Sequence, residues 1–186
     1  MGKLIYLTNT SLDGYIEDGS GRFDWTDPDD EFYAFITDLV RPVGTYLYGR
    51  RLYQAMAVWE TDPTLAERSA LLADFAAVWQ RPAKVVYSTT LDDVSTTRTR
   101  LERQFDPSTV RDLKALATSD ITIGGANLAG HAFAAGLVDE YQLMVHPVIV
   151  GGGKAAVPSG LRIDLELLDE RRLSQGVVYL RYRIAT

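Results

Sequence analysis

Two arginines follow a glycine at a point where a strand-like run turns directly into a short helical segment. Gly49, Arg50 and Arg51 come straight after residues 45–48. Glycine lets a backbone approach a ligand closely. The free N–H groups and partial positive charge of a helix start attract anions, so cations are unfavourable there unless an anion lies between them. This junction indicates a phosphate site, and the alternative is a solvated surface pair beside a turn glycine.

A second junction of the same kind follows residues 84–87. Ser88, Thr89 and Thr90 offer hydroxyl donors at the end of this predicted strand. Such residues also cap turns routinely, so the junction alone is a weak indication of ligand binding.

The third junction joins a predicted strand over residues 121–123 to a helix of small residues. Its sequence is Gly124, Gly125, Ala126 and Asn127. Paired glycines permit close backbone approach to a pyrophosphate. The alternative is a tight turn in which Asn127 caps the helix.

Several other chemistries are disfavoured. The glycines near residue 124 do not form the G-x-G-x-x-G fingerprint, and residues 151–154 lack the outer glycine and the Ser/Thr of a P-loop. The chain has no cysteine, which removes thiolate nucleophiles and Cys-bound zinc. His131 and His146 are the only histidines, and we expect them on a helix surface and at a strand end rather than on a metal.

The composition indicates a globular protein that acts on small molecules. Net charge is −6 and the sequence pI is about 4.9, which disfavours nucleic-acid binding. No apolar run approaches the ~18 residues of a membrane helix. The absence of cysteine and of signal-peptide features near residue 1 leads us to expect a cytoplasmic protein.

An acidic run near residue 27 invites an acid–base interpretation. We interpret Asp27 and Asp29 as capping residues, since acids in a first helical turn complement the helix dipole. Asp24 and Trp25 precede the predicted helix and are better candidates for lining a substrate pocket. Asp24 and Glu31 are the side chains we consider as proton donors, beside an ordered water.

The elements that must position these residues alternate in type along most of the chain. Apolar strand-like runs are separated by helical patterns, and the chain ends in a hairpin. This order predicts one α/β domain over residues 1–186, with a mixed, mostly parallel sheet, flanking helices and a C-terminal antiparallel hairpin. The predicted strands are residues 4–8, 45–48, 84–87, 121–123, 141–145, 165–168 and 177–184.

Capping signals predict where three helices begin. Asp27 and Pro28 would open the first helix, and a capping box from Thr64 to Glu67 would open a long second one. Asp106 would cap a third helix, with Val110, Leu113 and Leu116 facing inward. Phe32, Phe35, Ile36 and Leu39 form the apolar stripe of the first helix.

Seven short motifs occur in a recognisable order. They are residues 11–16 (SLDGYI), 23–25 (FDW), 48–53 (YGRRLY), 88–91 (STTL), 124–125 (GG), 137–140 (LVDE) and 147–153 (PVIVGGG). This order resembles the dihydrofolate-reductase-like superfamily. Within it the sequence is most similar to the C-terminal reductase domain of the bifunctional riboflavin-biosynthesis deaminase-reductase and to its stand-alone relatives, over essentially the whole chain.

The resemblance implies an eight-stranded mixed sheet, NADPH as hydride donor, a small-molecule substrate and a homodimer. Gly49, Arg50 and Arg51 would lie at the phosphate end of NADPH, and Ser88 and Thr89 on its 2′-phosphate side. The remaining implied cofactor-binding residues are Leu12 and Ile16, which flank the nicotinamide, and Gly124, Gly125, Ala126, Asn127 and Leu128, which hold the pyrophosphate.

The sequence departs from dihydrofolate reductases at one place. Those enzymes carry an acidic proton donor in the helix before the second strand, and here that place falls near Phe32 or Tyr33. We therefore expect an NADPH-dependent reductase resembling 5-amino-6-(5-phosphoribosylamino)uracil reductase rather than a dihydrofolate or pterin reductase. A non-catalytic nucleotide-binding module on the same fold is a further possibility, and a structural protein accounts least well for the arginines and glycine pairs.

Overall fold

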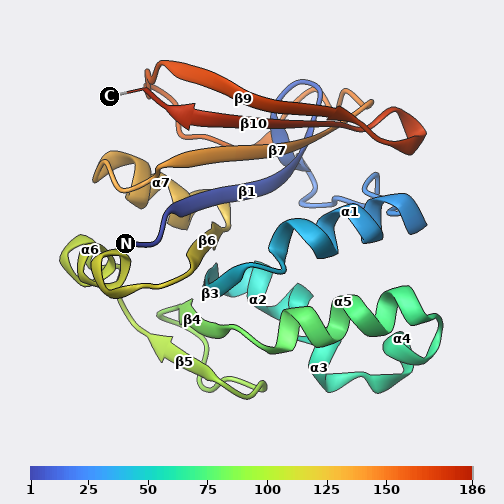
Figure 1. Cartoon of the computed structure of the whole chain (residues 1–186). Helices are drawn as coiled ribbons and strands as arrows, with labels where there is room; N and C mark the ends of the chain where they lie inside the picture. Colours follow the sequence, from blue (N-terminus) through green and yellow to red (C-terminus); the bar gives the residue numbers. More distant parts are fainter. Residues whose placement is uncertain (186) are drawn as a thin grey trace.

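Eight strands form one sheet at the centre of the computed structural model, which describes residues 1–185 (Figure 1). Their order across the sheet is β5-β4-β3-β6-β1-β7-β10-β9. The strands are β1 (Leu4–Ser11), β3 (Val43–Gly49), β4 (Ala83–Tyr87), β5 (Thr99–Glu102), β6 (Asp120–Gly124), β7 (Glu140–His146), β9 (Leu165–Arg172) and β10 (Val178–Ile184). A separate ribbon pairs β2 (Tyr15–Asp18) with β8 (Gly153–Ala155).

Most of the sheet is parallel. Within this sheet, strands β5, β4, β3, β6, β1 and β7 run parallel to one another, whereas the pairs β7–β10 and β10–β9 are antiparallel. The mostly parallel sheet with a C-terminal antiparallel hairpin is therefore confirmed. Parallel neighbours place their carboxyl ends at the same edge, so the residues after β3, β4 and β6 are gathered there.

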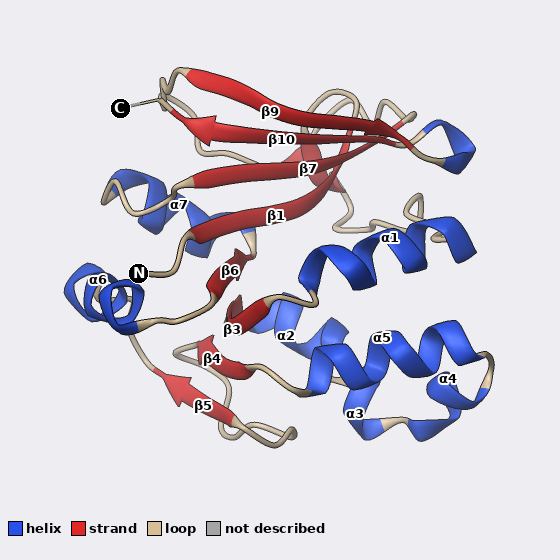
Figure 2. Ribbon diagram, in the orientation of Figure 1, coloured by secondary structure: helices blue, strands red, loops and turns tan. Residues whose placement is uncertain are grey.

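Helices cover both faces of the sheet (Figures 1 and 2). They are α1 (Asp30–Val40), α2 (Arg50–Met56), α3 (Val58–Thr61), α4 (Pro63–Glu67), α5 (Ala70–Gln80), α6 (Pro107–Leu116) and α7 (Ala126–Ala134). Helices α6 and α7 pack on one face through Val110, Leu128 and Phe133. The other face meets α1, α2 and α5 through an aromatic cluster that includes Trp79.

Successive side chains of β3 point to opposite faces of the sheet, so this strand contributes to the hydrophobic clusters on both faces. Leu47 is buried against the α6 and α7 side, whereas Tyr46 and Tyr48 point to the α1 and α5 side. The two tyrosine rings stack with centroids 5.3 Å apart. The indole Nε1–H of Trp79 donates to the Tyr48 hydroxyl at 3.1 Å, which ties α5 to the sheet.

The structure corrects the predicted start of the first helix. Helix α1 begins at Asp30, and its N-cap is Asp29, whose carboxylate accepts from Phe32 N at 3.0 Å. Asp27 and Pro28 precede the helix instead of opening it. Asp29 also accepts from the Ser174 hydroxyl, so it joins α1 to the turn before β10.

The predicted long helix after Thr64 is two helices. Asp62 caps α4 through Thr64 N, and Ser69 caps α5 through Leu72 N, so the chain restarts its helix within a few residues. Asp106 caps α6 as predicted. The prediction that Leu116 faces inward was wrong, because this last residue of α6 is 83% exposed.

A buried carboxylate joins the antiparallel hairpin to the parallel part of the sheet. Glu140, on β7, is almost fully buried and accepts two hydrogen bonds from the guanidinium of Arg181, at 2.8 and 3.0 Å. Lys3 Nζ and Gln142 Nε2 donate to it as well. Burial raises the pKa of Glu140, but these hydrogen bonds outweigh that effect and hold the pKa at about 2.

We predict that Glu140→Gln lowers the free energy of unfolding at pH 7 by about 3 kcal/mol, because it leaves Arg181 and Lys3 without their buried partner. Because the folded pKa of Glu140 lies below its ordinary value of 4.5, the carboxylate stabilises the fold above that pH. This stabilisation is lost as pH falls from 4.5 toward 2. Urea unfolding at several pH values measures both effects.

The matched control is Glu166→Gln, which removes an ion pair to Arg183 in which both side chains are more than half exposed. Its effect should stay below about 1 kcal/mol. Equal losses in the two variants would contradict the role assigned to Glu140.

Candidate functional site: a groove at the carboxyl edge of the sheet

The three predicted junctions line one groove of about 510 Å³ at the carboxyl edge of the parallel strands. We call it the junction groove. Its lining residues are Gly49, Arg50, Arg51, Leu52, Tyr87, Ser88, Thr89, Thr90, Arg103, Phe105, Gly125, Asn127, Leu128, His131 and Lys154. Clefts at this edge of open α/β sheets are where ligands generally bind.

Glycines shape the wall where β3 and β6 end. Gly125 has φ +96°, a conformation that side chains disfavour, and it is the N-cap of α7, which no side chain in the described residues caps. A Cβ on Gly125 would be in van der Waals contact with the backbone of Gly49, at 3.6 Å, so these two segments lie side by side. A Cβ on Gly124 would overlap a methyl group of Leu52. The backbone at the start of α7 thus lies beside the backbone at the end of β3.

Four cations line the groove, which makes it locally basic in an acidic protein. Arg50 is exposed and forms no ion pair within residues 1–185. Arg51 donates to the nearly buried carboxylate of Glu17 at 2.9 Å, and Lys154 lies 3.9 Å from the same oxygen. The two arginines are therefore not equivalent, because Arg51 already has a counter-ion from β2. Arg103 donates to backbone carbonyls after β4.

Ser88 acts as a capping residue. Its hydroxyl oxygen accepts from Thr90 N at 3.2 Å and from Leu91 N at 2.9 Å, so it organises the turn after β4. Thr89 is exposed at the same edge and lines the groove.

The structure adds groove residues that the sequence analysis missed. Arg103 follows the carboxyl end of β5, so the same strand-end argument would have found it once β5 was placed beside β4. His131 lies one helical turn after Asn127 and is exposed, as expected, with its ring stacked on Phe105 at 5.9 Å. Lys154 reaches the groove from β8, and no local signal in the sequence marks it.

A second hollow, which we call the aromatic cavity, adjoins the groove. It has a volume of about 220 Å³ and lies between the sheet and helices α1, α2, α3 and α5. Leu52 lines both spaces, and Gly124 lines the aromatic cavity where Gly125 lines the groove. A ligand in the groove would therefore lie beside whatever occupies the cavity.

Other predicted site residues lie elsewhere. Leu12 is 63% exposed in the turn after β1, and neither it nor Ile16 is among the residues that line the groove or the aromatic cavity. Ala126 is buried beneath the groove wall. Asp24 is exposed on the loop before α1.

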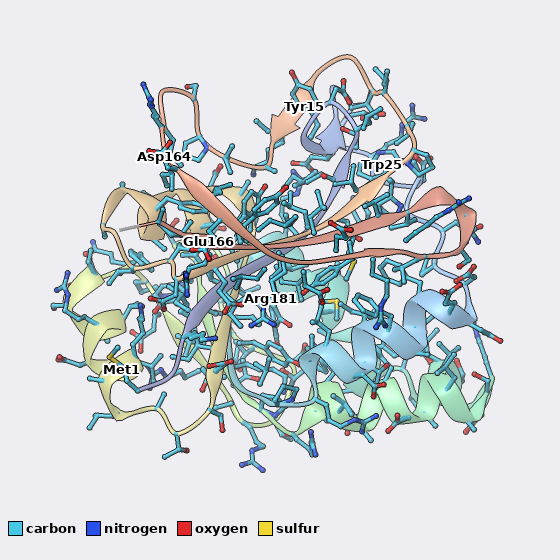
Figure 3. The ribbon with its side chains drawn as sticks, turned by 45° about the horizontal axis from the view of Figure 1, so that its top comes forward. Met1, Tyr15, Trp25, Asp164, Glu166 and Arg181 are labelled. Atoms are coloured by element: carbon cyan, nitrogen blue, oxygen red, sulfur yellow. The ribbon has the colours of Figure 1, made fainter. Side chains whose placement is uncertain are left out.

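Glu31 lines neither hollow. Its carboxylate accepts from the backbone N–H of Ser174 at 3.0 Å, which fixes the turn before β10. Trp25 lies on the loop before α1 (Figure 3) and packs edge-on against His146 with centroids 5.4 Å apart. His146 ends β7, as expected, and burial lowers its pKa. No three His, Asp or Glu side chains in residues 1–185 cluster as metal ligands would.

Comparison with known sequences matches this chain to one domain family over nearly its whole length. The profile of the RibD C-terminal domain covers residues 2–179. The chain belongs to the RibD C-terminal domain family. It is also 31% identical over 184 residues to YyaP of Bacillus subtilis strain 168, an uncharacterized protein, with 97% of this chain and 94% of YyaP covered.

Solved structures share the fold of this RibD C-terminal domain protein. A Shewanella sp. PV-4 protein named for riboflavin biosynthesis superposes with a TM-score of 0.73 at 20% identity, with both chains fully covered. The deaminase/5-amino-6-(5-phosphoribosylamino)uracil reductase of Thermotoga maritima gives 0.64 at 13%, and the match spans 99% of this chain but 57% of that one. Enterococcus faecalis dihydrofolate reductase complexed with NADP(H) gives 0.66 at 13%, with coverage of 100% and 98%. The dihydrofolate-reductase-like fold is confirmed, and family and neighbours support an oxidoreductase.

No helix in the described part of the chain combines the length and apolar character needed to cross a membrane.

We predict that Gly125→Ala lowers the free energy of unfolding by about 1–3 kcal/mol, because alanine is strained at this positive φ. Gly19→Ala is the control, since a Cβ there meets no atom within 4 Å and its φ is ordinary. It should change stability by less than about 0.5 kcal/mol. Denaturant unfolding compares the two, and a neutral Gly125→Ala would show that the junction does not depend on glycine.

Proposed function

We propose that this protein is an NADPH-dependent reductase that holds its cofactor in the junction groove. The observation that carries the proposal is the convergence of three strand ends and four cations on one groove. Family membership and the NADP(H) complex of the Enterococcus faecalis neighbour support the same function.

The residues of the groove fit a dinucleotide phosphate. No side chain within residues 1–185 caps the α7 amides beyond Gly125, so they are free to bind a pyrophosphate. Arg50 offers a guanidinium without an ion pair in the same residues. Thr89 and Arg103 both line the groove at the β4 and β5 ends, where we propose the 2′-phosphate binds. The stacked rings of Phe105 and His131 offer a flat surface for the adenine.

When bound, NADPH supplies a hydride from its nicotinamide to a C=O or C=N carbon and leaves as NADP⁺. The protein positions the two reactants. Gly124 and Leu52 lie at the border of groove and cavity, where the nicotinamide and the substrate would come within reach of each other. A proton must reach the reduced substrate. Glu31 is held by Ser174 and Asp24 is exposed outside the cavity, so we propose that water delivers this proton.

Arg50→Gln tests the cofactor site. We expect it to raise the Kd for NADPH by about tenfold, which corresponds to ~1.4 kcal/mol, because a guanidinium without another counter-ion is removed. Arg162→Gln, an exposed arginine outside the groove, should leave the Kd unchanged. Calorimetric titration of each variant measures this, and absence of NADPH binding by the wild-type protein at millimolar concentration would refute the proposal.

Glu17→Gln tests the pairing of Arg51. Removing the Glu17 charge frees Arg51 and makes the groove more positive, so the Kd for NADPH should fall by about threefold or more. The gain should shrink as salt is raised, since exposed charges are screened. Glu67→Gln, on exposed α4, is the control. Weaker binding by Glu17→Gln would mean that Glu17 positions Arg51 for the anion instead of competing with it.

A further inference from the structure

The side chains that line the aromatic cavity differ in chemistry from those that line the groove. Seven aromatic side chains line it, and no residue that lines it within positions 1–185 is acidic or basic. Tyr33, Trp59 and Phe75 meet edge to face, with ring centroids 4.7–5.8 Å apart. Such walls favour flat rings, because aromatic pairs gain from stacked or edge-on contact.

The uncharged walls set a limit on what can enter. An ion moved from water into an apolar cavity loses its hydration, and only a paired charge offsets that loss. A protonated pterin would need a carboxylate partner, and a phosphorylated sugar would need basic side chains. The lining of the cavity, as far as the described residues form it, provides neither.

One polar side chain of the cavity lining is held in a defined orientation. Asn9 lies near the carboxyl end of β1, opposite Met144 of β7, and lines the cavity. Its Oδ1 lies 3.0 Å from Nε2 of His146, whose ring is packed between Trp25 and Phe32. Burial lowers the pKa of His146. Because the Asn9 Oδ1 can only accept, the hydrogen bond is donated by Nε2–H of the ring. The amide N–H groups of Asn9 have no partner within residues 1–185 and remain available to a ligand.

A second polar atom lies without a partner in the wall. Tyr46 is 2% exposed and lines the cavity, and its hydroxyl is buried with no hydrogen bond in the described chain. Buried polar atoms in folded proteins are nearly always hydrogen-bonded. The Tyr46 hydroxyl is therefore a second unsatisfied polar group of a residue that lines the cavity.

We propose that the aromatic cavity binds an uncharged, planar compound of one or two fused rings, with a carbonyl oxygen that accepts a hydrogen bond from the Asn9 amide. The volume of 220 Å³ lies below the ~300 Å³ at which pockets for drug-sized ligands begin, which suits a small ring compound. The inference that this compound is reduced by hydride transfer rests on the proposed function. The inference that it binds in the cavity does not. It differs from the phosphoribosylated substrate in the name of the Thermotoga maritima relative.

Isatin and isatin-5-sulfonate form a matched pair of probes, because both are flat bicyclic diones and only one is charged. Calorimetric titration of the cofactor-free protein should show binding of isatin, and a Kd at least about tenfold higher for the sulfonate. Asn9→Leu should raise the Kd for isatin by about tenfold, since it removes the donor at similar size. Equal affinity for the two probes, or no binding of isatin, would overturn the proposal.

A variant with an added charge tests whether the uncharged lining causes the preference for isatin over the sulfonate. Met56 lines the cavity and is only partly buried, so Met56→Lys places an ammonium there on a chain of similar length. The Kd for the sulfonate should then fall by about tenfold, whereas Met56→Leu should keep the preference for isatin. An unchanged preference in Met56→Lys would contradict the electrostatic argument.

Titration of each variant with NADPH separates the two proposals and reports whether the variant is folded. NADPH binding without isatin binding would overturn only the inference about the cavity. Isatin binding without NADPH binding would overturn only the proposed function.

Discussion

Parallel pairing of β3 with β4 and β6 is the constraint on which the groove depends. Tyr48 lies opposite both Val86 and Gly124, so the residues that follow these strands emerge at one edge. Segments near residues 50, 88 and 125 meet only through this register. A shift of one residue would move Tyr46 and Tyr48 to the other face of the sheet and remove two walls of the aromatic cavity.

The close approach of β3 and β6 also divides the site into two chemical environments. Leu52 fills the space that a side chain at Gly124 would take, and it separates a basic groove from an apolar cavity. A reductase of this kind needs such a division, because the phosphates of a dinucleotide require cations while a flat uncharged ring is held best by aromatic walls. The acidic net charge of the chain does not oppose this, since the four groove cations act locally.

Surface hydrogen bonds place several acidic residues in structural roles. Asp29 and Glu31 both bind Ser174, which docks α1 against the turn before β10. Asp13 accepts from two backbone N–H groups at residues 150 and 151, and so joins the turn after β1 to the glycine-rich loop before β8. Glu17, in contrast, accepts from Arg51, a residue that lines the groove, and so reduces the positive charge that an anion would meet there.

Local patterns in the sequence were sufficient for seven of the eight strands of the main sheet, for its mostly parallel order and for the junctions at Gly49, Ser88 and Gly124, because strand periodicity and turn chemistry act over a few residues. Capping was predicted well at Asp106 and poorly at Asp27 and Thr64, where several neighbouring residues could serve as caps. The tertiary structure alone decided that Arg51 is paired with Glu17, that Glu31 faces Ser174, and that Arg103 and Lys154 join the groove. These contacts bring together residues far apart in the chain, and their partners depend on strand order and register, which no local pattern encodes.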